Sequence, residues 1–198
     1  MFRIGIIGAG WIAEKMAQAL SSTDDICVHA IASRSIRKAT AFAEEWNIPK
    51  AYGSYEEMVA DKEIDLVYIA TPHSHHFPHA MLALENGKPV LVEKAFTANA
   101  REAERLLETA RSRKNITLIE NFTMVDLICD DNECRGIIGH DKDGNYEAIT
   151  ANYTVLATGG IGGLFKHSTN YRHLTGDALA LAICHGHASG SLIMNGRF

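Results

Sequence analysis

Short apolar runs alternate with amphipathic stretches over the first 120 residues of the chain. Buried strands are indicated by the apolar runs at 3–7, 26–32, 66–70, 90–92 and 116–120. Helices are indicated by the periodic stretches at 11–20, 35–46, 55–60 and 77–86, and by a charged stretch that Asn99 can cap and that runs to about residue 113. A crossover between parallel strands is right-handed and must cover the sheet. The pattern therefore predicts an α/β fold with a doubly wound parallel (Rossmann) sheet.

The pattern changes after residue 121. Further strands are indicated at 124–129, 134–139 and 146–157, and short polar turns separate them, which is typical of an antiparallel β-meander. A glycine-rich loop follows at 158–163, and then a helix at about 176–185. All four prolines precede residue 90, whereas 11 of the 16 glycines follow residue 114. We therefore expect a Rossmann domain over residues 1–121, and a β-meander with a C-terminal helix over residues 122–198.

The amino-acid composition indicates which kinds of partner to expect. With 46% hydrophobic and 22% charged residues and a net charge of −5, the chain is composed like a soluble globular protein. No apolar run reaches the roughly 18 residues that a membrane span needs. No Lys/Arg stripe is present to neutralise phosphates. We therefore expect neither a membrane nor a nucleic acid as partner.

The four cysteines are Cys27, Cys129, Cys134 and Cys184, and no two of them form a C-x-x-C pair. We expect thiols in a cytoplasmic protein, because a chain of this length does not need disulfides for stability. Cys129 and Cys134 flank a tight connection and could face each other, with a reduced pair as the default.

A glycine-bearing turn, Gly8-Ala9-Gly10, follows the first strand and opens a helix that begins Trp11-Ile12-Ala13. This is the context of a dinucleotide fingerprint. Gly8 would permit the tight turn, Gly10 would let a pyrophosphate approach the main chain, and Ala13 would keep the helix close to the sheet. The anion would sit on the amino end of the helix. A glycine-rich turn without a nucleotide is the alternative.

The end of the second strand distinguishes the two nicotinamide dinucleotides. An acidic residue there would bind the ribose 2′-hydroxyl of NAD, but this chain has Ser33-Arg34. NADP is therefore favoured, and NAD remains possible. The alternative for Arg34 is a solvated residue at a helix start.

Two further loops lie at the carboxyl ends of parallel strands, where ligands of such sheets bind. One contains Thr71-Pro72 and the other Glu93-Lys94, and we count all four residues as site candidates. The Lys94 amine could donate a proton beside a nicotinamide, and Glu93 could hold that amine.

Four histidines, His73, His75, His76 and His79, lie in or after the first of these loops. They raise the possibility of a metal site. No carboxylate or cysteine of this region has ligand spacing with them, so we expect polar surface and no metal.

Residues 1 to about 113 resemble the N-terminal half of the glucose-fructose oxidoreductase and inositol dehydrogenase family, in the branch of the dihydrodiol dehydrogenases. The resemblance rests on the segments Gly-Ala-Gly-Trp-Ile-Ala at 8–13, Ser-Arg at 33–34, Thr-Pro-x-x-x-His at 71–76 and Val-Glu-Lys-Ala-Phe-Thr at 92–97. The usual Glu-Lys-Pro of the family is Glu-Lys-Ala here. The resemblance implies that Lys94 is the site lysine, that His76 lies near the nicotinamide, and that hydride is exchanged with a sugar or diol carbon.

Residues 115–185 resemble an internal fragment of L-aspartate oxidase, a member of the fumarate reductase and succinate dehydrogenase flavoprotein superfamily. The resemblance rests on Ala-Thr-Gly-Gly at 157–160, Ser-Thr-Asn at 168–170 and Thr-Gly-Asp at 175–177, with flanking residues. It implies that Gly159 and Gly160 pack on FAD. That family carries its ADP-binding turn near its own N-terminus, and residues 115–185 contain no such turn. FAD is therefore less expected than NADP.

The chain thus resembles a fusion of two truncated oxidoreductases. We expect an NADP-binding oxidoreductase domain with weak or no turnover alone, because a substrate domain is missing. The alternatives are a flavoprotein fragment and a nucleotide-sensing or interaction module that could self-associate through the meander edge. We also expect residues 146–198 to pack less well than residues 1–120.

Overall fold

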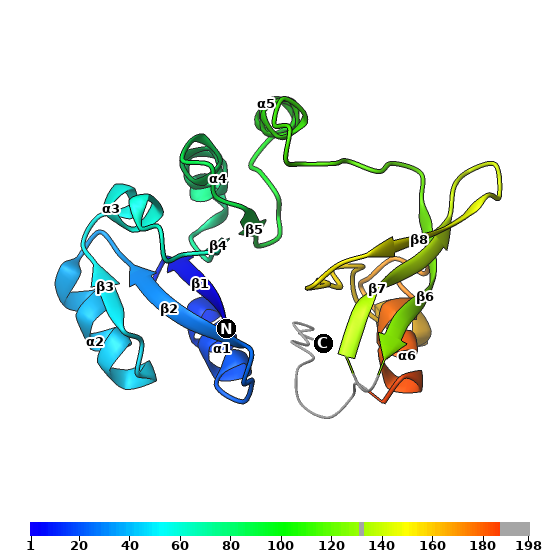
Figure 1. Cartoon of the computed structure of the whole chain (residues 1–198), viewed down its shortest axis with the longest axis horizontal. Helices are drawn as coiled ribbons and strands as arrows, with labels where there is room; N and C mark the ends of the chain where they lie inside the picture. The colour runs from blue at the N-terminus through cyan, green and yellow to red at the C-terminus, as the bar shows by residue number, and fades with distance from the viewer. Residues whose placement is uncertain (131–132, 187–198) are drawn as a thin grey trace. The chain divides into compact units, whose positions relative to one another are not determined.

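The computed structural model describes residues 1–130 and 133–186. The chain divides into two compact units, Met1–Leu118 (unit 1) and Ile119–Phe198 (unit 2). Figure 1 shows the helices and strands of both units. No helix within the described ranges combines the length and apolar character needed to cross a bilayer.

Unit 1 contains a parallel sheet with the strand order β3-β2-β1-β4-β5. The strands are β1 (Phe2–Ile7), β2 (Ile26–Ala32), β3 (Lys50–Tyr52), β4 (Leu66–Ile69) and β5 (Val90–Val92). The order reverses at β1, which lies between β2 and β4 and is therefore the topological switch point of the sheet. The predicted doubly wound parallel fold is confirmed.

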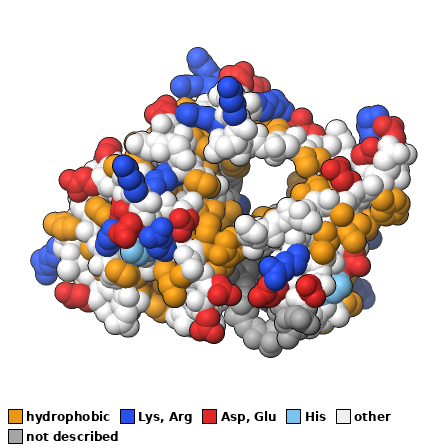
Figure 2. Space-filling view, viewed as in Figure 1, with side chains coloured by type: hydrophobic (Ala, Val, Ile, Leu, Met, Phe, Trp, Pro, Cys, Tyr) orange, Lys and Arg blue, Asp and Glu red, His pale blue; other side chains and the backbone are white. Residues whose placement is uncertain are grey.

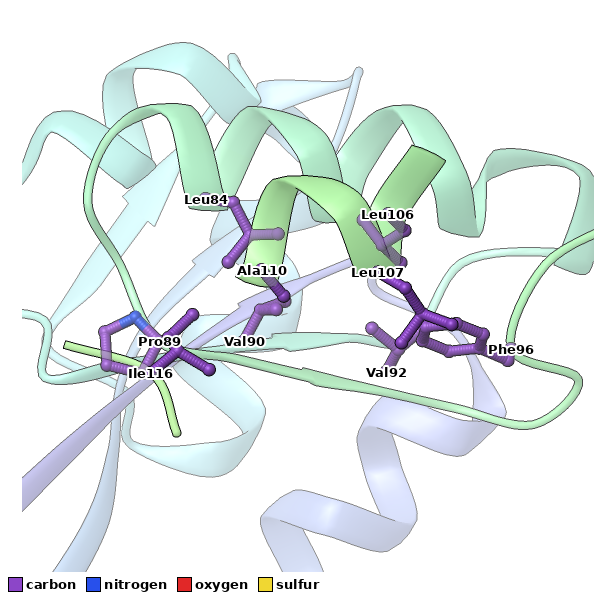
Figure 3. Close-up of a pocket in the computed structure, with 9 residues that line it drawn as sticks. All are labelled: Leu84, Pro89, Val90, Val92, Phe96, Leu106, Leu107, Ala110 and Ile116. Carbon is purple, nitrogen blue, oxygen red and sulfur yellow. The ribbon is translucent and has the colours of Figure 1, made fainter. Parts of the chain in front are cut away.

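The prediction of a last strand of this sheet at 116–120 is wrong, because this segment forms no strand. The main chain turns directly after the last helix of the unit, where the Ile116 amide donates to the Arg113 carbonyl at 3.2 Å. Ile116 then packs against α4 (His76–Glu85), β5 and α5 (Ala100–Arg111), where it helps to line an apolar hollow of about 360 Å³ (Figure 3). The apolar residue that suggested a strand is thus partly buried against helices.

Helices cover both faces of the sheet. The remaining helices of unit 1 are α1 (Trp11–Leu20), α2 (Ile36–Trp46) and α3 (Tyr55–Ala60). One face packs Ile6 and Ile31 against α1 and α2, and the other packs Ile7 and Ile69 against α3 and α4. Neighbouring residues Ile6 and Ile7 thus face opposite layers, as the two-residue period of a strand requires. The side chains of Ser35, Ser54 and Asn99 cap α2, α3 and α5.

Unit 2 is an antiparallel meander of β6 (Thr123–Asp130), β7 (Glu133–His140) and β8 (Tyr146–Thr150), followed by α6 (Asp177–Cys184). The meander and the helix were predicted, but the third strand was expected to reach residue 157. Its register explains the difference, because Thr150 lies opposite Gly136 and β7 begins only three residues earlier. A β8 that reached residue 157 would therefore extend beyond the first residue of β7 and have no partner there.

Candidate functional site

The turn after β1 sits between the ends of two neighbouring strands. The Gly8 amide donates to the Ala32 carbonyl of β2 at 2.9 Å, and the Ala70 amide after β4 donates to the Ile7 carbonyl at 2.9 Å. Gly8 has a φ of +103°, and a Cβ added there would lie 2.9 Å from the Ala70 carbonyl oxygen. Only glycine fits this position without strain.

Gly10, the next glycine of the turn, is not crowded by the protein itself. It precedes the first residue of α1 in extended backbone, no side chain caps the helix there, and a Cβ added at Gly10 would meet no atom within 4 Å. The space above the amino end of α1 is therefore open. Ala13 is fully buried one turn later and keeps the helix close to the sheet. A helix amino terminus without a side-chain cap, facing open space, suits a phosphate group.

The predicted cofactor residues Trp11 and Ile12 form the first turn of α1. The Trp11 side chain is 48% exposed, and the Lys15 ammonium lies 5.7 Å from the centre of its ring. This turn therefore presents main-chain amides and a partly exposed indole at the site.

At the end of β2, Ser33 and Arg34 differ in exposure. Ser33 is buried, its amide donates to the Tyr52 carbonyl at 3.1 Å, and its hydroxyl accepts a bond from the Ser35 amide at 3.4 Å. Arg34 is exposed. Ser33 thus shapes the loop, whereas the Arg34 guanidinium is available to a ligand.

The loop after β4 carries Thr71 and Pro72. The Thr71 hydroxyl lies 3.0 Å from Nδ1 of His79, which is half-buried in α4 and meets the Tyr55 ring edge-on. Burial lowers the pKa of His79 to about 4, and the nearby charges of His75 and Arg34 contribute to this shift. His79 is therefore neutral at pH 7, and it holds the Thr71 side chain in one position.

His76 connects the two candidate loops. Its ring is fully buried, with Nε2 2.8 Å from the Thr71 carbonyl oxygen and Nδ1 2.7 Å from the Ala95 carbonyl oxygen. Carbonyl oxygens only accept, so both contacts are hydrogen bonds only when both ring nitrogens carry a proton. That His76 lies near a nicotinamide stays a prediction. In this structure both of its ring nitrogens point to main-chain carbonyl oxygens.

The loop after β5 carries Glu93 and Lys94. The Tyr68 hydroxyl on β4 donates to the Glu93 carboxylate, and burial together with this bond raises the pKa of Tyr68 well above its ordinary value. The expectation that Glu93 holds the Lys94 amine is therefore corrected, because the described ion pairs do not join these two residues. The Lys94 side chain is exposed.

A candidate metal site lies away from this edge. Ligand atoms of His29, Asp61 and Glu63 lie within 4.8 Å of one another. The Lys50 ammonium already pairs with two of these three residues, since it lies 2.8 Å from Asp61 Oδ2 and also contacts Glu63. Its bonds to these carboxylates raise the pKa of Lys50. The cluster is an ion-pair network with its own cation.

Gly159 and Gly160 belong to unit 2 and are exposed. Their neighbours Gly162 and Gly163 have a clear packing role, since a Cβ at either would lie within 2.4 Å of Asn170 or Arg172. These glycines allow two loops to touch. The proposed FAD contact of Gly159 and Gly160 stays a prediction.

Sequence reasoning missed two contacts. Tyr68 lies in an apolar strand, where its hydroxyl was the only signal that it could reach a polar group. His79 was grouped with the other histidines, although its position one helical turn after His76 indicated that it would also face the β4 loop.

Comparison with known proteins agrees with this geometry. Over 122 residues the chain is 45% identical to D-xylose 1-dehydrogenase (NADP(+)) of Hypocrea jecorina, covering 56% of this chain and 31% of that protein. Over 113 residues it is 44% identical to trans-1,2-dihydrobenzene-1,2-diol dehydrogenase of Mus musculus, covering 56% and 34%. The chain spans about a third of the length of these curated relatives.

A solved structure of KijD10, a 3-ketoreductase from Actinomadura kijaniata in complex with TDP-benzene and NADP, matches with a TM-score of 0.55 and 35% identity. The match covers 61% of this chain and 38% of that one. The family described as an oxidoreductase family with an NAD-binding Rossmann fold (GFO_IDH_MocA) matches residues 2–122. The chain therefore belongs to the GFO_IDH_MocA oxidoreductases, and unit 1 contains their NAD(P)-binding Rossmann domain.

Proposed function

We propose that the chain binds NADP with its pyrophosphate on the amino end of α1. The observation that carries this proposal is the open space at Gly10, above a helix start without a side-chain cap and at the switch point of the sheet. Main-chain N–H groups and the positive end of the helix dipole would hold the phosphates there.

Arg34 is proposed to select NADP over NAD. Its exposed guanidinium follows β2, where NAD-binding sheets carry an acidic residue for the ribose hydroxyl. A guanidinium binds a 2′-phosphate through charge-assisted hydrogen bonds, which contribute more than neutral ones. Arg34 lies near enough to His79 for its charge to contribute to the lowered pKa of that ring, which supports a position of Arg34 close to the β4 loop.

The test is a pair of titrations, with NADPH and with NADH, on the full chain and on Arg34→Ala. We expect the substitution to weaken NADPH binding about 10- to 100-fold, as for the loss of a charge-assisted bond, and to leave NADH binding nearly unchanged. Lys62→Ala is the matched control, since this exposed cation precedes β4 and lies at the opposite end of the strands. Equal affinity for both dinucleotides in the parent chain would contradict the proposed selectivity.

The proposed reaction is hydride exchange with a sugar or diol carbon, as the names of the relatives suggest. A bound nicotinamide would supply or accept the hydride. We propose that Lys94 exchanges a proton with the substrate oxygen, taking it when a hydroxyl is oxidised and giving it when a carbonyl is reduced. The exposed position of Lys94 directly after β5, at the edge where ligands bind, supports this role. We expect weak turnover by this chain alone, since hydride transfer requires a substrate held in attack geometry.

An assay of NADP reduction with D-xylose tests this reaction. We expect Lys94→Met to abolish the residual rate without changing NADPH affinity. A rate that survives the substitution would remove Lys94 from the reaction.

We make two further proposals, on the location of the chain and on its self-association. We propose a cytoplasmic location, supported by four cysteines in the thiol form. We also propose self-association through the meander, because most residues of the edge strand β8 are exposed. Light scattering on the purified chain tests the second proposal, and a monomer at all concentrations would contradict it.

A further inference from the structure

Two thiols face each other across the hairpin of unit 2. Cys129 on β6 lies directly opposite Cys134 on β7, and the next pair is Asp130 with Glu133. Directly opposite residues of an antiparallel pair project from the same face of the sheet. Both cysteines are partly exposed, so a small reagent can reach them.

The spacing of such a pair suits a covalent link. Opposite Cα atoms in antiparallel strands lie about 4.5–5.5 Å apart. A disulfide accepts Cα separations of about 4.4–6.8 Å. The register therefore predicts a Cα separation within disulfide range for this pair, which directly follows a register shift between Ile128 and Cys129.

We propose that Cys129 and Cys134 form a reversible oxidation site, which a low-molecular-weight disulfide such as oxidised glutathione converts into a cross-strand disulfide joining β6 to β7. One cysteine thiolate attacks a sulfur of the reagent, forming a mixed disulfide and releasing one reduced glutathione. The other cysteine then attacks the protein sulfur of that mixed disulfide and releases the second. The two protein thiols lose two electrons and two protons, and the reagent gains them as two thiols.

The surroundings of the pair predict a slow first step. Burial raises the pKa of the Cys129 thiol, and the neighbouring Cys134 and Asp126 raise it further. Since the thiolate is the attacking form, the raised pKa slows a first attack by Cys129 at neutral pH.

The other two cysteines are not opposed in this way. Cys27 lies on β2 of unit 1, and Cys184 is an exposed residue at the end of α6. The variant carrying Cys27→Ser and Cys184→Ser therefore keeps the proposed site and removes the competing thiols.

Mass spectrometry tests the proposal on the full chain. Trypsin cuts after Lys114 and Arg135, so Cys129 and Cys134 fall on one peptide, whereas Cys27 and Cys184 fall on others. After exposure to oxidised glutathione and alkylation of remaining thiols, peptide 115–135 should lack two hydrogen atoms and carry no alkyl group. The double variant should give the same peptide, and dithiothreitol should restore both thiols.

Two results would overturn the proposal. One is a peptide 115–135 that stays fully alkylated or keeps a stable glutathione adduct, which would show that the second thiol does not resolve the first. The other is a disulfide between this peptide and that of Cys27 or Cys184. Cys134→Ser must abolish the internal loss of two hydrogen atoms.

Discussion

The two units of this chain bury their apolar side chains to different depths. In unit 1 the sheet is covered on both faces, and residues such as Ile6, Ile7 and Met58 are fully buried. In unit 2 the buried apolar residues of the described ranges are Leu127, Ala178 and Ala182.

Large apolar side chains stay exposed in unit 2. Val155, Leu164 and Tyr171 are 60% to 76% exposed. Figure 2 shows hydrophobic side chains at the visible surface of the molecule. A parallel sheet between two helical layers excludes water from both faces, whereas a three-stranded meander with one helix has less apolar surface to bury.

The largest expected effect concerns Gly8 of unit 1. Gly8→Val would place a β-branched side chain at a φ of +103° and against the Ala70 carbonyl. We expect the free energy of unfolding to fall by at least about 3 kcal/mol, measured by urea denaturation. Gly10→Val is the matched control, because its Cβ meets open space and its backbone is extended. Equal stability of the two variants would contradict the geometry of the turn.

Hydrogen exchange addresses the comparison of the two units directly. Amides of Ile6 and Ile69 are expected to exchange at least about 100-fold more slowly than the amide of Ile149 on β8, since strands buried on both faces open only with the whole unit. Uniform protection across both units would refute the contrast.

The next largest effect on the free energy of unfolding is expected at the buried ring of His76 in unit 1. His76→Leu removes the ring nitrogens that contact the carbonyl oxygens of Thr71 and Ala95, so we expect a loss of about 1–3 kcal/mol in unfolding free energy. His73→Ala, at an exposed neighbour, should change stability by less than about 0.5 kcal/mol. A similar small effect of both substitutions would show that the loops are held by other contacts.

A smaller, pH-dependent effect is expected from His79. Its pKa is about 4 in the folded chain and about 6.5 when unfolded, so between these values the unfolded state binds the additional proton. Stability should therefore fall as the pH falls from 6.5 to 4. Because His79 is only half-buried, we expect solvent to screen this to about 1–2 kcal/mol.

Urea denaturation of the parent and of His79→Gln at pH 7 and pH 4.5 measures this contribution. The difference between the two pH values should be smaller in the variant, which cannot titrate at this position. An identical pH dependence would exclude His79 as the cause.

The sequence predicted those features that depend on neighbours along the chain. The cap Asn99 and the turn at Gly8 follow from local backbone requirements and are found as expected. The strand expected at 116–120 failed because the packing of Ile116 against α4 and α5 depends on residues distant in sequence.

The same limit applies at the site. The carboxylate of Glu93 could be placed at the end of a strand, but its partner Tyr68 lies 25 residues earlier. Such a hydrogen bond depends on strand order and side-chain direction, which a single sequence does not contain.

Calorimetric titration of NADPH into the parent chain and into Gly10→Val tests whether the pyrophosphate binds at the amino end of α1. We expect the parent to bind one NADPH, and the variant to stay folded but to lose binding by at least about 100-fold, since a side chain fills the space where the pyrophosphate approaches the main chain. Undiminished binding by the folded variant, or no binding by the parent, would contradict the account.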